Sequence, residues 1–155
     1  LGVGTTTSPH KIVGYWLRDH TTPDDTVAVI GTPSDGPQVL YWSERRTATR
    51  YVQMAFVWVE NLSQGLKDAQ ALIGPLSDPA ALFVNEIRAN SPKYIVLDVG
   101  NPVLNWSLDT APASPDFAKE VRRAYRPAVR LGDYQVYERI PAKPQAQRGG
   151  GGQHR

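Results

Sequence analysis

The sequence predicts a three-layer α/β domain, an αβα sandwich whose mixed, mainly parallel sheet of about five strands ends in an antiparallel hairpin. In the stretch 93–101, KYIVLDVGN, the residues Ile95, Val96 and Leu97 are consecutive and apolar. A strand without alternation is buried on both faces, as in a sheet covered by two layers of helices. Capping residues followed by proline open three predicted helices, at 8–9, 78–79 and 114–115. A turn containing glycine at 132–133 separates two β-rich runs, which is typical of a hairpin.

The first part of the chain is predicted to form a helix, a strand, a glycine-rich loop and a second helix. The helix that starts at Pro9 ends near His20, because TTP follows and stops it. The run 26–30, TVAVI, is a short buried strand. Turn-forming residues fill 31–37, GTPSDGP, and 38–43 is a short helix.

The middle of the chain has less regular patterns. The run 47–52, TATRYV, has the composition of a strand. The run 53–62, QMAFVWVENL, suits either a buried helix or an extended segment, and both interpretations stay open. Residues 66–72 are predicted to be helical and to stop at the Gly-Pro pair 74–75.

The last part of the domain is predicted to complete the sheet. A helix from Pro79 to about Asn90 leads directly into the strand 94–99, as in βαβ units. An irregular stretch follows through residue 113. The helix that opens at 114–115 has an apolar face of Phe117, Val121, Ala124 and Tyr125. The runs 128–131 and 134–140 then form the hairpin.

We expect one folded domain at 9–140, preceded by a small polar linker at 1–8 and followed by a disordered tail at 141–155. The tail, PAKPQAQRGGGGQHR, is too polar and too rich in glycine to pack a core. All 15 acidic residues precede it, whereas three of the 17 basic residues lie in it. The folded part is therefore close to neutral, which argues against a nucleic-acid partner because such a partner needs a clustered basic face.

Cysteine is absent, which excludes disulfides and thiolate metal sites. The longest uncharged apolar run near the middle, 51–59, is far shorter than the roughly 20 residues that span a bilayer. The sequence starts at Leu1, and we therefore expect a fragment or a processed product.

The best local candidate for ligand binding is the loop 31–36, with Gly31, Thr32, Ser34, Asp35 and Gly36. A glycine-rich turn between a strand and a helix can offer backbone N–H groups to an anion. The sequence GTPSDG matches neither G-x-G-x-x-G nor G-x-x-x-x-G-K-[ST], and no lysine follows it. The alternative interpretation is an ordinary turn between a strand and a helix.

The second candidate is the pair Asp98 and Asn101 at the end of the strand 94–99. Ligands of open α/β sheets bind at the carboxyl ends of the strands, where this pair lies. The alternative is that both side chains bond to their own backbone in a turn.

Other polar residues give weaker signals. The basic cluster Arg45, Arg46 and Arg50 suits either phosphate binding or a solvated helix end, and the second interpretation is favoured. The three histidines are scattered without a metal-ligand spacing, and no G-x-S-x-G motif occurs. The sequence therefore predicts no catalytic residue, no metal site and no cofactor in this part of the protein.

The order of several segments is recognisable: TPDDTVAVIG, then YWSERRTATRY, then NSPKYIVLD, then YRPAVRLGDYQVYER. In this order the chain resembles the C-terminal extracytoplasmic domain of bacterial GT-C class membrane glycosyltransferases, of the family 39 protein mannosyltransferase-like and aminoarabinose transferase-like kind. The resemblance covers roughly residues 9–140.

The resemblance implies a polytopic membrane enzyme that transfers a sugar from a polyprenyl-phosphate donor and carries its catalytic acid in the membrane part. This chain would then be a non-catalytic accessory domain on the extracytoplasmic side, with residues 1–8 leaving the last transmembrane helix. Its partners would be the transmembrane module of the same polypeptide and acceptor substrate or lipid-linked sugar. One alternative is a stand-alone Rossmann-like module that binds a nucleotide or sugar phosphate. The other is a small hydrolase or transferase with a site at the sheet edge.

Overall fold

A computed structural model describes residues 7–50, 79–100, 108 and 115–141 of the chain. The helices are α1 (Pro9–His20), α2 (Asp35–Ser43), α4 (Pro79–Asn90) and α5 (Pro115–Ala124). The strands are β1 (Thr26–Ile30), β2 (Arg46–Thr47), β3 (Tyr94–Asp98), β4 (Tyr125–Leu131) and β5 (Tyr134–Arg139). None of the helices in these ranges is long and apolar enough to cross a membrane.

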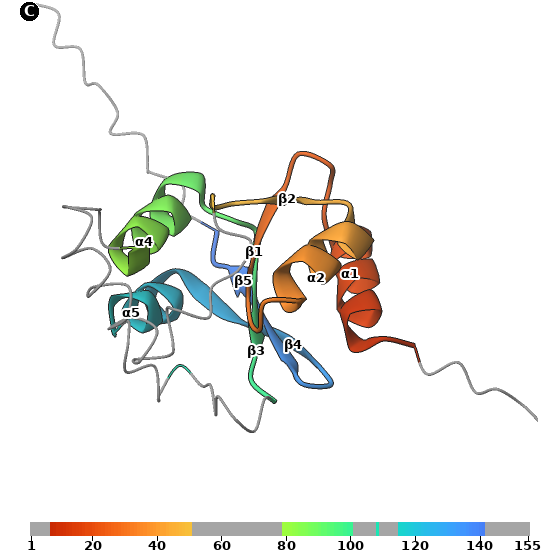
Figure 1. Cartoon of the computed structure of the whole chain (residues 1–155). Helices are drawn as coiled ribbons and strands as arrows, with labels where there is room; N and C mark the ends of the chain where they lie inside the picture. Colours follow the sequence, from red (N-terminus) through yellow and green to blue (C-terminus); the bar gives the residue numbers. More distant parts are fainter. Residues whose placement is uncertain (1–6, 51–78, 101–107, 109–114, 142–155) are drawn as a thin grey trace, which may run out of the picture.

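The five strands form one mixed sheet in the order β2-β1-β3-β5-β4 (Figure 1). β1 pairs in parallel with β2 and with β3, and Ile30 lies opposite Leu97. β5 runs antiparallel to both β3 and β4, and Gly132 at the hairpin turn has a φ of 59°. That left-handed conformation suits glycine, which has no Cβ to clash. The mixed sheet and the closing hairpin confirm the predicted fold class.

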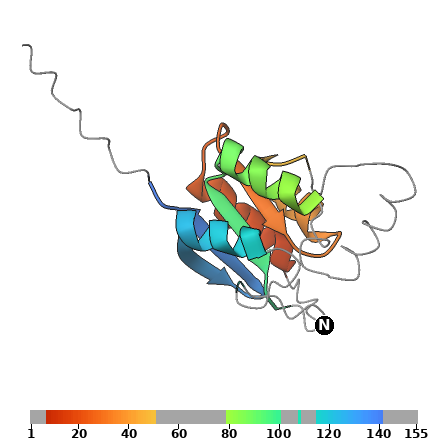
Figure 2. The same ribbon diagram turned by 90° about the vertical axis from the view of Figure 1, so that its left-hand side faces the viewer.

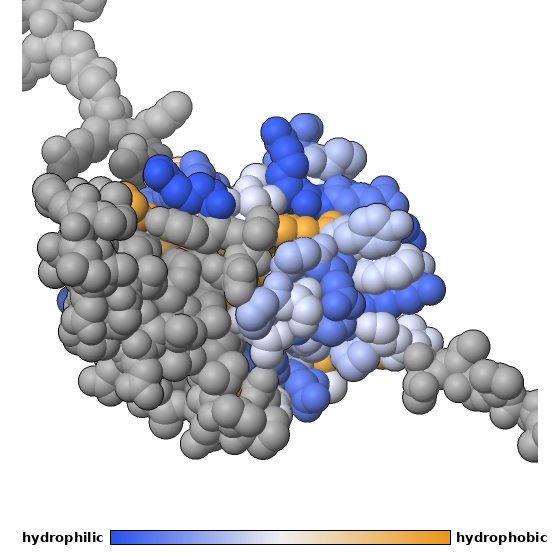
Figure 3. All heavy atoms as spheres, viewed as in Figure 1, coloured by the Kyte–Doolittle hydropathy of each residue, from blue (hydrophilic) through white to orange (hydrophobic). Residues whose placement is uncertain are grey.

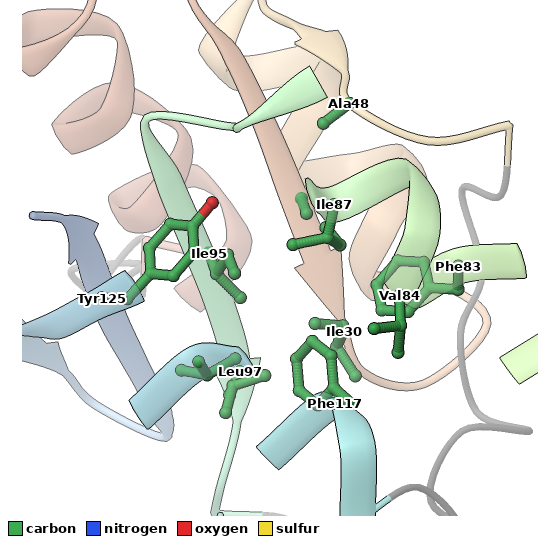
Figure 4. Packing of buried hydrophobic residues seen from close by; sticks show 11 residues of the cluster. Ile30, Ala48, Phe83, Val84, Ile87, Ile95, Leu97, Phe117 and Tyr125 are labelled. Carbon is green, nitrogen blue, oxygen red and sulfur yellow. The ribbon is translucent and has the colours of Figure 1, made fainter. Parts of the chain in front are cut away.

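Helices cover both faces of the sheet, with α1 and α2 on one and α4 and α5 on the other (Figures 1 and 2). Alternate side chains of the central strands point to opposite faces, so each face has its own core. The core under α1 and α2 contains Val13, Leu17 and Val39 against Val27, Val29, Tyr94, Val96, Tyr134 and Val136. The core under α4 and α5 contains Phe83, Ile87, Phe117 and Val121 against Ala28, Ile30, Ile95 and Leu97 (Figure 4). All five residues of β3 are buried, as its uninterrupted apolar pattern predicts.

A buried carboxylate ties α4 to α5 beside the second core. Glu120 is 4% exposed and accepts hydrogen bonds from Arg88 Nε at 3.0 Å and from Arg123 NH2 at 2.5 Å. Burial by itself raises the pKa of Glu120, but the hydrogen bonds and positive charges of the two arginines outweigh it and lower that pKa. The two arginines thus stabilise the buried negative charge of Glu120 at the contact between α4 and α5.

Tyr125 connects the hairpin to the start of β3. Its hydroxyl donates a hydrogen bond of 3.0 Å to the carbonyl of Pro92, and the residue is 5% exposed. Burial raises the pKa of Tyr125 to about 12. The sequence pattern predicts Tyr125 on the apolar face of the preceding helix. That prediction is wrong, because Tyr125 is the first residue of β4.

Other boundaries also differ from the predicted ones. The first hairpin strand starts at Tyr125 and not at residue 128, and β3 and β5 each end one residue earlier than predicted. The second helix begins at Asp35 and not at residue 38, because the first turn of a helix tolerates both Gly36 and Pro37. The N–H of Gly36 needs no partner inside the helix, and Pro37 has no N–H to satisfy. The predicted strand 47–52 is β2, Arg46–Thr47, and Ala48 N–H still donates to Val27 O at 2.8 Å. The predictions for 51–78, 101–107, 109–114 and the tail from 142 lie outside the described residues, as does the linker up to residue 6.

Candidate ligand site at the carboxyl ends of β1 and β3

The two candidate sites of the sequence lie next to each other in the structure. β1 and β3 are adjacent parallel strands, so Gly31 follows β1 at the same sheet edge at which Asp98 ends β3. The loop and the acidic residue thus share the carboxyl edge, where open α/β sheets bind their ligands. Asn101 lies outside the described residues.

Asp35 is the centre of the polar groups at this edge. It is 3% exposed, and its carboxylate accepts hydrogen bonds from the backbone N–H of Thr32 at 2.5 Å and from the hydroxyl of Tyr134 at 2.7 Å. A third contact joins it to Nε2 of His10 at 2.7 Å. A buried carboxylate is stable only when donors replace the water it has lost, and these three groups do so.

The contacts of Asp35 continue to the start of α1. His10 Nδ1 lies 3.2 Å from Ser8 Oγ, so the imidazole connects Ser8 to Asp35. The rings of His10 and Tyr134 also touch, with centroids 5.8 Å apart. A row of hydrogen-bonded side chains therefore joins the first turn of α1, the first turn of α2 and the first residue of β5. Its members are Ser8, His10, Asp35 and Tyr134.

Tyr134 serves this cluster as a hydrogen-bond donor. Burial raises the pKa of its phenol, and the hydrogen bond to Asp35, with the negative charges of Asp35, Asp98 and Asp133, raises it further. The hydroxyl is therefore protonated at neutral pH and holds the Asp35 carboxylate.

Gly31 is explained by the same carboxylate. A Cβ on Gly31 would lie 2.1 Å from Asp35 Oδ2 and 2.8 Å from Asp35 Cβ. The glycine at the end of β1 thus makes room for the buried side chain of Asp35. This role fits the alternative interpretation of the loop as an ordinary turn between a strand and a helix. The N–H groups of Thr32 and Asp35 are also engaged, with Asp35 Oδ2 and with Thr32 O respectively.

Asp98 has a similar setting at the end of β3. It is 6% exposed, and its carboxylate accepts a 3.2 Å hydrogen bond from Gly100 N–H. A Cβ on Gly100 would lie 2.2 Å from Asp133 Oδ1, and the N–H groups of Val99 and Gly100 both donate to Asp133 O. The end of β3 is thus fastened to the turn of the hairpin.

Two hydroxyl groups lie on the outer side of the loop 31–36. Thr32 Oγ1 and Ser34 Oγ lie 3.1 Å apart at the surface, while Asp35 and Gly36 are buried in the first turn of α2. A ligand at the loop 31–36 would meet the hydroxyls of Thr32 and Ser34. The Asp35 carboxylate beneath them already accepts hydrogen bonds from three groups of the same chain. Within the described ranges, His, Asp and Glu side chains form no group of three that could hold a metal ion.

The arginines 45, 46 and 50 do not act as one cluster. Arg45 donates to Thr21 Oγ1 at 2.6 Å, to Thr21 O at 2.9 Å and to Arg18 O at 3.1 Å. It therefore caps the C-terminal end of α1, where a cation complements the helix dipole. Arg50 pairs with Glu86 of α4 through its side chain and its backbone N–H. Arg45 therefore lies at a helix end, but it caps α1 and not the preceding helix α2.

A separate cavity of about 450 Å³ opens beside the hairpin. Its lining combines apolar side chains, two tyrosines and two arginines: Val99, Leu108, Val121, Arg122, Tyr125, Pro127, Arg130, Gln135 and Tyr137. It begins next to the end of β3, at Val99, but lies on the α5 side of the sheet. No local sequence motif marks this cavity, because most of its lining comes from three separate elements, α5, β4 and β5.

His10 and Tyr134 were missed for the same reason. They are 25 and 99 residues from Asp35, and no spacing rule connects residues at such distances. The one local signal is the pair Ser8-Pro9, which fixes the start of α1 and so the place of His10.

These features define a three-layer α/β domain with a buried polar cluster at the carboxyl edge of its parallel strands. Among solved structures, the chain is similar to the crystal structure of the C-terminal globular domain of an oligosaccharyltransferase from Archaeoglobus fulgidus. The sequence identity is 16% and the TM-score is 0.44, and the similarity covers 87% of this chain and 99% of that chain. No protein-family model matches the chain, and no curated protein matches it.

Proposed function

We propose that this chain is the accessory domain of a polytopic membrane glycosyltransferase, on the extracytoplasmic side. The membrane part of the same polypeptide transfers a sugar from a polyprenyl-phosphate donor, in the manner of family 39 enzymes. The domain positions the acceptor or the catalytic loops and does not catalyse the transfer by itself.

The observation that carries the proposal is the place of the recognisable segments in the fold. TPDDTVAVIG holds β1 and the turn before it, NSPKYIVLD holds β3, and YRPAVRLGDYQVYER holds the hairpin. β1, β3 and β5 are neighbours in the sheet, so segments that are distant in sequence build one continuous layer. The segments that carry the family resemblance thus contain the strands at the centre of the sheet, in the order in which they occur along the chain.

The chemistry of the carboxyl edge also supports a non-catalytic role. Asp35 already holds three donors from its own chain, and a general base needs a lone pair that can reach a substrate proton. Its contacts join α1, α2 and β5, so Asp35 has a structural role in the fold.

The proposal is tested by two measurements. The 155-residue chain alone should transfer no sugar from a polyprenyl-phosphate donor, and transfer by this chain would overturn the proposal. The second measurement is topological. Since the 155 residues contain no cysteine, Tyr41→Cys in a full-length protein freed of its other cysteines gives one labelling site, at a position 72% exposed.

A membrane-impermeant maleimide should label that site on intact cells. The matched control is Val39→Cys, at a fully buried position, which should react only after denaturation. Labelling of position 41 only after cell lysis would contradict the extracytoplasmic placement.

The cavity beside the hairpin favours a second candidate function, a module that binds a nucleotide or sugar phosphate. Its volume falls within the roughly 300–1,000 Å³ of ligand pockets, and Arg122 and Arg130 on its wall suit a phosphate. A ligand at about 100 times its Kd stabilises a protein by about 2.7 kcal/mol, which thermal unfolding detects.

Arg130→Met should abolish that stabilisation. Arg126→Met is the matched control, since Arg126 lies on the same strand but pairs with Glu138 and does not line the cavity. No stabilisation by nucleotides or sugar phosphates would rule this function out.

A further inference from the structure

The outer side of the α1–α2 layer carries a shallow hollow of about 290 Å³. Three aromatic side chains and one ion pair line it: Tyr15, Tyr41, Trp42, Arg18 and Glu44. Tyr41 is 72% exposed, the largest exposed fraction among the large apolar and aromatic side chains that the structure describes as exposed. Among the described residues, its ring contacts the indole of Trp42.

The close packing of the two helices brings the aromatic rings together. A Cβ on Gly14 would lie 2.3 Å from Trp42 Cβ, so the end of α2 touches the backbone of α1. The indole of Trp42 then meets Tyr15 and Tyr41 edge to face, with centroids 5.7 Å and 5.0 Å apart. The three rings thus form an aromatic wall on the outer side of the two helices.

Arg18 and Glu44, the two charged side chains that line the hollow, balance each other. Arg18 NH1 lies 3.4 Å from Glu44 Oε1, and the Arg18 guanidinium also lies over the Tyr15 ring, 4.7 Å from its centroid. Lys11 at the edge places its ammonium 4.6 Å from the centroid of Trp42. Glu44 has a left-handed φ of 56° at the end of α2, and its N–H bonds to Leu40 O. The carboxylate and the guanidinium therefore offer acceptors and donors side by side, with no net charge between them.

We propose that this hollow binds a neutral saccharide. The C–H face of a pyranose ring packs against an aromatic wall, while its hydroxyls both donate and accept hydrogen bonds, and Arg18 and Glu44 supply the complementary groups. An anionic ligand would meet the Glu44 carboxylate, and a cationic one would meet Arg18. The volume, just below the range of about 300–1,000 Å³ for ligand pockets, suits one or two sugar rings on an open surface.

The visible surface of the α1–α2 layer argues against a bilayer or an apolar protein partner. Figure 3 shows the described surface over α1 and α2 mostly in blue and pale colours, with orange in small areas only. Docking surfaces for membranes and obligate partners expose larger apolar patches. The inference rests on the hollow alone and not on the proposed function, so either one can fail without the other.

The test is a titration of the 155-residue chain with glucose, mannose, galactose, maltose and cellobiose, followed by amide and indole chemical shifts in 1H–15N NMR. At least one sugar should give saturable shifts confined to the residues around Tyr15 and Trp42. Tyr41→Ala should weaken the binding by about tenfold or more. Ile12→Ala is the matched control, because Ile12 is 45% exposed on α1 but does not line the hollow.

A second variant separates a neutral ligand from a charged one. Replacing Arg18 and Glu44 together by glutamine keeps hydrogen-bonding groups and removes both charges, so a saccharide should still bind within a few-fold. Thermal unfolding of each variant checks that it is folded. The inference is overturned if no sugar gives saturable shifts or if Tyr41→Ala binds as the parent does. It is also overturned if the same resonances respond only to phosphatidylcholine–phosphatidylglycerol vesicles.

Discussion

The buried cluster around Asp35 makes the sharpest prediction about stability. Tyr134→Phe removes one hydrogen bond to a charged acceptor, and Asp35→Ala removes the acceptor of three donors at once. The two residues touch directly, at 2.7 Å, and both are almost completely buried. Their effects should therefore depend strongly on each other.

The magnitudes follow from these contacts. A hydrogen bond to a charged group contributes about 1.5–3 kcal/mol, so Tyr134→Phe should lower the free energy of unfolding by about 2 kcal/mol. Asp35→Ala leaves a buried hydroxyl and a backbone N–H without a partner and should cost about 4 kcal/mol. In the Asp35→Ala background Tyr134→Phe removes an unsatisfied hydroxyl, so it should cost almost nothing. The coupling energy of the cycle should be about 2 kcal/mol.

The assay is urea unfolding of the parent, the two single variants and the double variant, followed by circular dichroism. Tyr41→Phe is the control, because an exposed hydroxyl should change the free energy of unfolding by less than about 0.5 kcal/mol. Additive effects of Asp35→Ala and Tyr134→Phe, with a coupling below about 0.5 kcal/mol, would refute the cluster as a cooperative unit.

Three further changes are expected to alter stability in a defined direction. Gly31→Ala should cost about 1–3 kcal/mol in urea unfolding, since the added methyl group meets a pinned Asp35 carboxylate, and an unchanged midpoint would contradict this. The folded-state pKa of Glu120 is lowered, so its contribution is present above its ordinary pKa of 4.5 and lost as the pH falls through the folded value. Glu120→Gln should therefore flatten the acid branch of a stability–pH curve, and a parallel acid branch would count against the ion pairs. The folded-state pKa of Tyr125 is raised to about 12, so its contribution is lost as the pH rises from 10 toward that value, and Tyr125→Phe should reduce the alkaline loss by about 2–3 kcal/mol.

Local patterns predicted most of the described fold. The uninterrupted apolar run of β3 and the helix starts at Pro9 and Pro79 are properties of neighbouring residues, and the structure confirms them. The start of β4 at Tyr125 depends on a more distant contact. Tyr125 has a helical neighbour on one side, but its pairing with Arg139 makes it a strand residue.

The candidate site was predictable in position but not in composition. The position of Gly31 and Asp98 at one edge of the sheet follows from the rule for parallel strands, whereas the direct pairing of β1 with β3 does not. The donors that satisfy Asp35 come from His10 and Tyr134, whose proximity depends on the packing of α1 and β5. The cavity beside the hairpin and the aromatic hollow also arise from packing between elements, so no motif in the sequence could mark them.

The central claim is that this domain assists a membrane glycosyltransferase, and sugar transfer in membranes tests it most directly. The full-length protein is compared with a variant in which residues 9–140 are replaced by a flexible Gly-Ser linker, at equal abundance in the membrane. We expect the replacement to slow transfer from the polyprenyl-phosphate-linked sugar by about tenfold or more, equivalent to about 1.4 kcal/mol of transition-state stabilisation. Equal transfer rates with and without the domain would contradict the account.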